Sequence, residues 1–230
     1  MRQLYFFCYI LIVFGGFASA NESPSPSGSA LIVNSMPEDL YAKGAFIEDI
    51  SGLNLLETQH LYLIAEDGRV FTAKGNADNS IDYEQDNSSD TEVVLDKALA
   101  ELSGQPYRTV RSGNTNPSSF WYINIKQSGD YCVSSNTAEL WRPNARRTET
   151  LTVTHNKLPS KHKWSRGKPT YSFAFTNGAK YRMKLGSSPA NNIVIHKIPT
   201  NIKHRVRRAG WMAEKRCRFQ ARALLLTASQ

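Results

Sequence analysis

Cys132 and Cys217 are the two residues of this chain with the widest range of chemistry: a nucleophile, a redox couple or a disulfide. A nucleophilic or redox cysteine needs a nearby His or cation that lowers the pKa of its thiol. No C-x-x-C spacing occurs, and no local signature of a cysteine enzyme surrounds either residue. A disulfide needs only an oxidising compartment and an even number of cysteines. The pattern therefore favours a disulfide between Cys132 and Cys217 over catalysis.

The other reactive groups give weaker signals. Ser160 and Lys163 match the S-x-x-K spacing of an acyl-transfer pair, but a short basic segment produces that match by chance. Four of the five histidines lie where Lys and Arg would repel a metal cation, and zinc needs three or four convergent ligands. These four are His155, His162, His196 and His204. G-x-S-x-G, H-E-x-x-H, Walker and G-x-G-x-x-G motifs do not occur, so we predict no catalytic residue, metal or cofactor.

An acidic stretch over residues 76–90 is the remaining candidate for a metal site. Asp78, Asp82, Glu84 and Asp86 have the density of a calcium loop, but the required Gly and the closing Glu are not at the loop spacing. The stretch is also poor in apolar residues, which predicts a mobile loop. The sequence therefore favours a protein that is not an enzyme, and the alternative is an enzyme whose site is not visible in local motifs.

The first twenty residues predict a secretory signal peptide. Arg2 precedes an apolar run over residues 4–17, and Ala18-Ser19-Ala20 gives a small-x-small cleavage pattern. The run is too short to span a bilayer comfortably, although an uncleaved anchor is the alternative. Cleavage removes Cys8 and leaves the even cysteine pair. We therefore expect a periplasmic or secreted protein without a transmembrane segment, in which the bridge adds about 4–5 kcal/mol of stability.

Charge divides the chain near residue 100. Residues 21–100 hold fifteen acidic and four basic residues, a net charge of −11, whereas residues 101–230 hold five acidic and twenty-three basic residues, a net charge of +18. The halves could attract each other, the basic half could face an anionic partner, or the charges could be solvated surface. The densest basic stretches, 155–168 and 203–208, are predicted to be exposed loops. The candidate anion-binding residues are Lys161, Lys163, Arg166, Arg205, Arg207 and Arg208.

The elements that must position these residues begin with an acidic segment. Residues 21–30 are a Ser/Pro-rich flexible linker, and residues 31–105 form the acidic segment. Alternating apolar residues over 53–74, interrupted by Asp67-Gly68, predict a β-hairpin. Ser89-x-x-Glu92 is a capping box that predicts a short helix near residues 91–103, ended by Gly104 and Pro106.

Residues 106–230 change to a period of two and predict a basic β-sandwich domain with a terminal helix. The predicted strands are 107–111, 119–126, 130–134, 138–142, 148–154, 170–176, 180–185 and 192–198. Asn177-Gly178 predicts a hairpin turn, and residues 208–228 predict a helix with Cys217 on its apolar face. We therefore expect a mainly β fold, a β-sandwich or partly open barrel, with the C-terminal helix tied to the sheet by the disulfide.

Two stretches of the basic half resemble exported bacterial proteins of unknown function. They are GDYC (129–132) continuing to LWRP (140–143), and WMAEKRCRFQARALL (211–225). The resemblance covers residues 119–226 and leaves the acidic segment unplaced. It implies a disulfide-tied C-terminal domain and no particular activity. The strand after Gly129-Asp130-Tyr131 is also similar to accessory β-sandwich domains of secreted bacterial enzymes, a likeness of fold alone.

Together these features predict a non-enzymatic envelope or periplasmic protein. Its basic C-terminal domain would bind a partner protein or an anionic surface, such as an envelope polymer. A secreted or periplasmic enzyme is the alternative. A nucleic-acid-binding protein is a further alternative that export disfavours, so nucleic acid is an unlikely partner.

Overall fold

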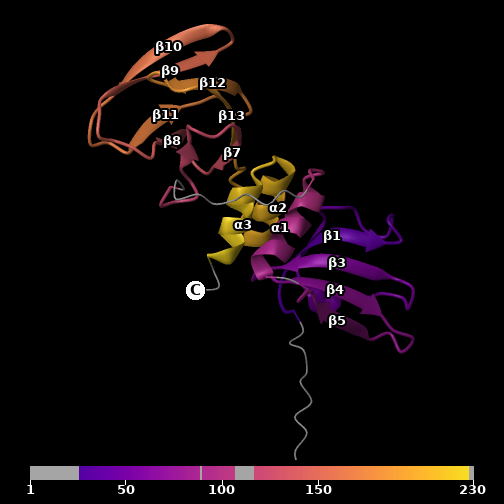
Figure 1. Cartoon of the computed structure of the whole chain (residues 1–230). Helices are drawn as coiled ribbons and strands as arrows, with labels where there is room; N and C mark the ends of the chain where they lie inside the picture. Colours follow the sequence, from indigo (N-terminus) through magenta and orange to yellow (C-terminus); the bar gives the residue numbers. More distant parts are fainter. Residues whose placement is uncertain (1–25, 89, 107–116, 228–230) are drawn as a thin grey trace, which may run out of the picture.

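The computed structural model describes residues 26–88, 90–106 and 117–227. These residues form two units, an α/β unit and a β-sandwich (Figure 1). The α/β unit contains strands from the start of the chain and helices from both its middle and its end. The sandwich occupies residues 117–198, between two of those helices.

The sheet of the α/β unit is antiparallel, with the strand order β2-β1-β3-β4-β5. Its strands are β1 (Ala30–Met36), β2 (Phe46–Ile47), β3 (His60–Ala65), β4 (Val70–Gly75) and β5 (Ile81–Gln85). The hairpin predicted around Asp67-Gly68 is confirmed, because β3 and β4 pair directly across that turn. The expectation of a loop over 76–90 is wrong for β5. Ile81 and Tyr83 alternate with acidic residues there and pack on the core as an edge strand.

Both faces of this sheet are covered. Ala30 and Ile32 of β1 lie in one core, together with Ile50 of the short 3-10 helix η1 (Ile50–Gly52). Leu31 and Val33, the alternate residues of the same strand, lie in a second core beneath the helices. Alternate side chains of a strand point to opposite faces, so four consecutive buried residues in β1 show a sheet that is enclosed on both sides.

Three helices cover the second face: α1 (Thr91–Leu102), α2 (Arg205–Glu214) and α3 (Arg218–Leu226). The predicted helix at 91–103 is confirmed as α1, and its N-cap is Asp90, whose side chain accepts a hydrogen bond from the Glu92 amide. The single helix expected at 208–228 is instead two helices. Arg216 adopts a left-handed conformation with φ of 63°, which ends α2 and turns the chain into α3.

The sandwich consists of two facing sheets. One has the order β10-β9-β12-β13-β7 and the other the order β11-β8-β6. The strands are β6 (Ile123–Asn124), β7 (Gly129–Val133), β8 (Thr137–Trp141), β9 (Glu149–His155), β10 (Leu158–Trp164), β11 (Thr170–Ala174), β12 (Lys180–Leu185) and β13 (Asn191–Lys197). One apolar core contains inward-facing residues from both sheets. The mainly β fold with a disulfide-tied C-terminal helix is therefore present.

Several local predictions for this unit differ from the structure. The stretch 155–168, expected to be a loop, contains β10, because its basic residues alternate with His162 and the buried Trp164. Asn177-Gly178 does not close a hairpin: β11 pairs with β8, and β12 pairs with β9 and β13. The turn instead carries the chain from one sheet to the other. Of the strand expected at 119–126 only β6 forms, and residues 107–111 lie outside the described residues.

The terminal helices pack on the N-terminal sheet, whereas the sequence grouped them with the basic domain. This packing redistributes the charge. Residues 26–106 and 199–227 hold sixteen acidic and twelve basic residues, a net charge of −4. Residues 117–198 hold three acidic and thirteen basic residues, a net charge of +10. The helices therefore offset much of the acidic charge of the sheet that they cover, and the sandwich is left strongly basic.

Candidate functional site

The most concentrated charge in the described residues lies on the outer face of the five-stranded sheet of the sandwich. In β12, Tyr181, Met183 and Leu185 are buried while the residues between them are exposed. Alternation along the strand therefore places Lys180, Arg182 and Lys184 on the outside.

The register extends this row of cations across three strands. Lys161 of β10 lies opposite Thr152 of β9, and Thr152 lies opposite Lys184 of β12. Lys163 of β10 is two residues further along the same side as Lys161. We call Lys161, Lys163, Lys180, Arg182 and Lys184 the basic face; all five are exposed. Neighbouring cations along one strand are about 7 Å apart, and those two strands apart are roughly 10 Å apart.

No acidic side chain on β9, β10 or β12 balances this charge. The one acid on these strands, Glu149 of β9, lies opposite Trp164 and binds Arg142 at 3.1 Å. On β13 and β7, His196 pairs with Asp130 at 2.8 Å. None of the five cations of the basic face forms an ion pair with another described residue. Mutual repulsion and the lack of counter-charge make this face a region of high positive potential.

The predicted anion-binding residues fall into two separate groups. Lys161 and Lys163 belong to the basic face, and Arg166 is exposed just beyond the end of β10. The other three lie on α2, in the other unit (Figure 1). The structure therefore does not bring the two predicted clusters together.

The arginines of α2 make structural contacts. Arg205 donates to the Glu66 carbonyl at 2.8 Å and to the Leu225 carbonyl at 3.1 Å. Arg208 donates to the Ile202 carbonyl at 3.0 Å, and the guanidinium of Arg207 lies over the Phe46 ring. These contacts join α2 to the β3–β4 turn, to the end of α3 and to β2, whereas the buried Nε atoms of Arg205 and Arg208 have no hydrogen-bond partner among the described residues.

The predicted disulfide is confirmed: Cys132 of β7 bonds to Cys217 with an S–S distance of 2.04 Å. Cys217 is the residue preceding α3, and its partner lies on an edge strand of the sandwich. The bridge therefore links the two units, and neither cysteine is free to act as a nucleophile.

Gln220 is a residue that the sequence did not single out. It lies one turn after Cys217 and is buried. Its side-chain oxygen accepts from the Cys132 amide at 2.7 Å, and its side-chain nitrogen donates to the Cys132 and Phe120 carbonyls at 2.9 and 2.8 Å. The side-chain amide of Gln220 thus hydrogen-bonds to the backbone N–H and C=O of an edge strand, as a neighbouring strand would. The only sequence signal for Gln220 was its position three residues after Cys217, which was predicted to lie on the apolar face of the helix.

The groups weighed for catalysis and metal binding make local contacts instead. Ser160 and Lys163 lie three residues apart on one strand, so they point to opposite faces and cannot form an acyl-transfer pair. His162 contacts the hydroxyls of Ser160 and Tyr171 at 3.0 and 3.2 Å. In residues 26–88, 90–106 and 117–227 no three His, Cys, Asp or Glu side chains gather as a metal site.

Three of the four acidic residues weighed for calcium have protein partners. Asp78 accepts hydrogen bonds from Ser80, and Asp86 accepts them from Ser88, and these bonds hold the pKa of both carboxyls below the usual value. Glu84 pairs with Lys74 at 2.9 Å. The serine contacts define turns at either end of β5.

No protein-family model matches the chain, and neither a curated protein nor a solved structure is significantly similar to it. The resemblance to exported bacterial proteins therefore stays a prediction. Among the described residues, no helix is long and apolar enough to cross a membrane.

Proposed function

We propose that this chain is a non-enzymatic exported protein that binds an anionic polymer of the cell envelope through the basic face of its sandwich. The observation that carries the proposal is five exposed cations on β10 and β12, the two strands that flank β9, with no acidic residue on either of those two strands. Such a surface raises the local concentration of polyanions and speeds their association.

The shape of the basic face favours a polymer over a small molecule. The cations are spread along and across a sheet at intervals of about 7–10 Å. An extended chain with repeated carboxylate or sulfate groups can contact several of them at once. Thr150, Thr152 and Thr154 of β9 lie between the two rows of cations and can add hydrogen bonds to hydroxyl or anionic oxygens.

Export is supported by two features. The N-terminal twenty residues have the charge and apolar pattern of a signal peptide. The disulfide fits an oxidising compartment such as the periplasm or the exterior. An envelope polymer is an anionic partner that such a protein would meet.

The test is a matched pair of charge variants. One carries Lys161→Gln, Lys163→Gln, Arg182→Gln and Lys184→Gln. The control carries Lys43→Gln, Lys126→Gln, Lys203→Gln and Lys215→Gln, four exposed lysines outside the basic face, so both variants have the same net charge. We expect the first to lose at least tenfold in affinity for a polyuronate and for dextran sulfate, with a weaker salt dependence, and the control to bind like the parent.

Two results would contradict the proposal. Equal loss in both variants would show that net charge, and not the basic face, controls binding. Binding of an acidic protein or of DNA at salt concentrations where both polysaccharides dissociate would point to the partner-protein or nucleic-acid alternative.

A further inference from the structure

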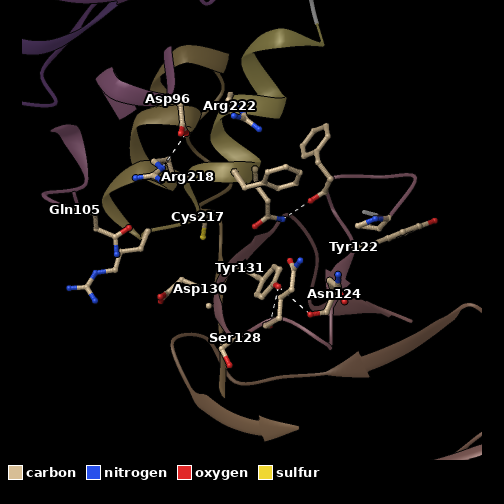
Figure 2. Close-up of a pocket in the computed structure, with 17 residues that line it drawn as sticks. Asp96, Gln105, Tyr122, Asn124, Ser128, Asp130, Tyr131, Cys217, Arg218 and Arg222 are labelled. Atoms are coloured by element: carbon tan, nitrogen blue, oxygen red, sulfur yellow. Dashed lines mark hydrogen bonds and ion pairs between the residues drawn. The ribbon is translucent and has the colours of Figure 1, made fainter. Parts of the chain in front are cut away.

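A second surface lies where the two units meet. A cleft of about 490 Å³ opens between α3 and the segment that leads into β7 (Figure 2). We call it the junction cleft. Its helix side includes Arg216, Arg218 and Arg222, and its opposite side includes Phe120 and Tyr122. Its volume is within the range of small-molecule sites in proteins, which distinguishes it from the open basic face.

The charges in the junction cleft are not balanced. Arg218 pairs with Asp96 of α1 at 3.2 Å, and Asp130 pairs with His196 at 2.8 Å. Asp96 and Asp130 are the only acidic residues that line the cleft in the described part of the chain. Arg216 and Arg222 have no acidic partner among the described residues. The guanidinium of Arg222, which lies beside Phe219, is therefore available to an anion that enters.

The remaining surface of the cleft is largely apolar and aromatic. Phe219 lies on α3, between Arg216 and Arg222 in the sequence, and is 40% exposed. The guanidinium of Arg222 lies 5.7 Å from the centre of its ring. Phe120, Tyr122 and Tyr131 contribute aromatic surface from the other side. Aromatic rings exposed beside cations suit a ligand with a flat apolar body and a charged group.

The two sides of the cleft are held at a fixed separation. The Cys132–Cys217 disulfide joins the start of α3 to β7, and Gln220 bonds to the backbone of both Cys132 and Phe120. Tyr131 donates to the carbonyls of Asn124 and Gln127, which fixes the turn before β7. A site that is already formed loses little conformational entropy when a ligand binds.

From this arrangement we propose that the junction cleft binds a small organic anion with an aromatic or other flat apolar body. Its carboxylate, sulfonate or phosphate group contacts Arg222, and its apolar body lies against Phe219 and the aromatic residues opposite. The site is separate from the basic face, so the proposal does not depend on polymer binding.

The test uses 2-naphthoate as the probe and 2-naphthol as its uncharged counterpart, each titrated into the purified chain by calorimetry. We expect 1:1 binding of 2-naphthoate and at least tenfold weaker binding of 2-naphthol, because charge-assisted hydrogen bonds to arginine are among the stronger polar contacts. Arg222→Gln should weaken 2-naphthoate binding about tenfold, and more than Arg216→Gln does. Phe219→Ala should weaken both probes.

Lys215→Gln is the matched control. It removes the same charge one residue before Arg216, but Lys215 is exposed and does not line the cleft. We expect this variant, and the four-fold variant of the basic face, to bind 2-naphthoate like the parent. Failure of 2-naphthoate to bind at millimolar concentration would overturn the proposal, as would equal weakening by Lys215→Gln and Arg222→Gln. Because Arg216, Arg222 and Phe219 are on the surface or partly exposed, circular dichroism should show these variants folded.

Discussion

The five-stranded sheet of the α/β unit and the five-stranded sheet of the sandwich differ in how much of their surface is buried. In the α/β unit, β1 has four consecutive buried residues, since helices cover one face and the segment around η1 covers the other. In the sandwich, β12 alternates strictly between exposed and buried residues. The first sheet is enclosed, whereas the second has one face buried in the sandwich core and one face open to a partner.

This difference in burial explains which basic residues have a structural role and which are available for binding. Arg205 and Arg208 were predicted to bind anions, but they lie on a helix that covers the enclosed sheet and donate to backbone carbonyls. Lys161 and Lys163 belong to the open sheet and have no partner in the described residues. Both stretches are rich in basic residues, and only the packing distinguishes their roles.

Removing the covalent link between the units should have the largest effect. Cys132→Ser with Cys217→Ser opens a loop with a sequence separation of 85 that contains most of the sandwich. We expect a loss of about 4 kcal/mol in the free energy of unfolding. Because α2 and α3 stay packed on the N-terminal sheet, proteolysis of the variant should attack the connections between the units before it attacks the helices. Denaturant titration and limited proteolysis measure both effects.

Reductant provides the control for that variant. It should destabilise the parent to the level of the double variant and leave the double variant unchanged. Two reactive thiols in denatured, unreduced protein from the native compartment would contradict the role of the bridge.

A second substitution affects the sandwich alone. The side chain of Arg142 is fully buried, pairs with Glu149, donates to the Ser165 and Lys168 carbonyls and lies 5.0 Å from the centre of the Trp164 ring. Arg142→Met removes the partner of Glu149 and one donor from each of the two carbonyls, so we expect a loss of about 3 kcal/mol in sandwich stability. Tryptophan fluorescence during denaturation measures it, with the exposed Arg146→Met as control. Equal effects of the two substitutions would show that the buried contacts of Arg142 add nothing.

Gln220→Ala tests the polar link between the units. It removes three hydrogen bonds and leaves the Cys132 amide and carbonyl without their partner. We expect a loss of about 2 kcal/mol, smaller than that of the disulfide. Hydrogen exchange at the Cys132 amide should accelerate in the variant, and Gln127→Ala, at an exposed position, should leave it unchanged. Unchanged exchange in Gln220→Ala would show that the amide contact is dispensable.

Alkaline pH gives a smaller effect. Burial raises the pKa of Tyr131 above its usual value, so the folded chain keeps a proton that the unfolded chain loses above pH about 10. The contribution of this hydroxyl is therefore present below that pH and is lost as pH rises toward the folded pKa, at about 1.4 kcal/mol per pH unit. Tyr131→Phe should flatten the fall in stability above pH 10. An identical alkaline profile for the parent and Tyr131→Phe would contradict the burial effect.

The sequence predicted those features that depend on local pattern. Alternation and Asp67-Gly68 predicted the β3–β4 hairpin, and the even cysteine pair predicted the disulfide. The Ser89-x-x-Glu92 pattern predicted α1, although the N-cap of that helix is Asp90. It did not predict the partner of the terminal helices. Their apolar face is compatible with any sheet, and a tight contact such as Gly210 of α2 against Leu31 is visible only in the fold.

The candidate site was partly predictable for the same reason. Lys161 and Lys163 were predicted from charge density, but Lys180, Arg182 and Lys184 join them only through the pairing of β9 with both β10 and β12. The junction cleft was not predicted, because Arg216 and Arg222 lie nearly a hundred residues from Phe120 and Tyr122, and only the packing of α3 brings them together.

The central claim is that the open face of the sandwich, and not the helices, binds an anionic polymer. The most direct measurement is nuclear magnetic resonance of isotope-labelled protein during titration with an oligogalacturonate at low salt. We predict that amide shift changes concentrate on β9, β10 and β12 and disappear as salt rises, since exposed charges are screened over about 8 Å at physiological ionic strength. Changes confined to α2 and α3, or no change at any oligomer concentration, would contradict the account.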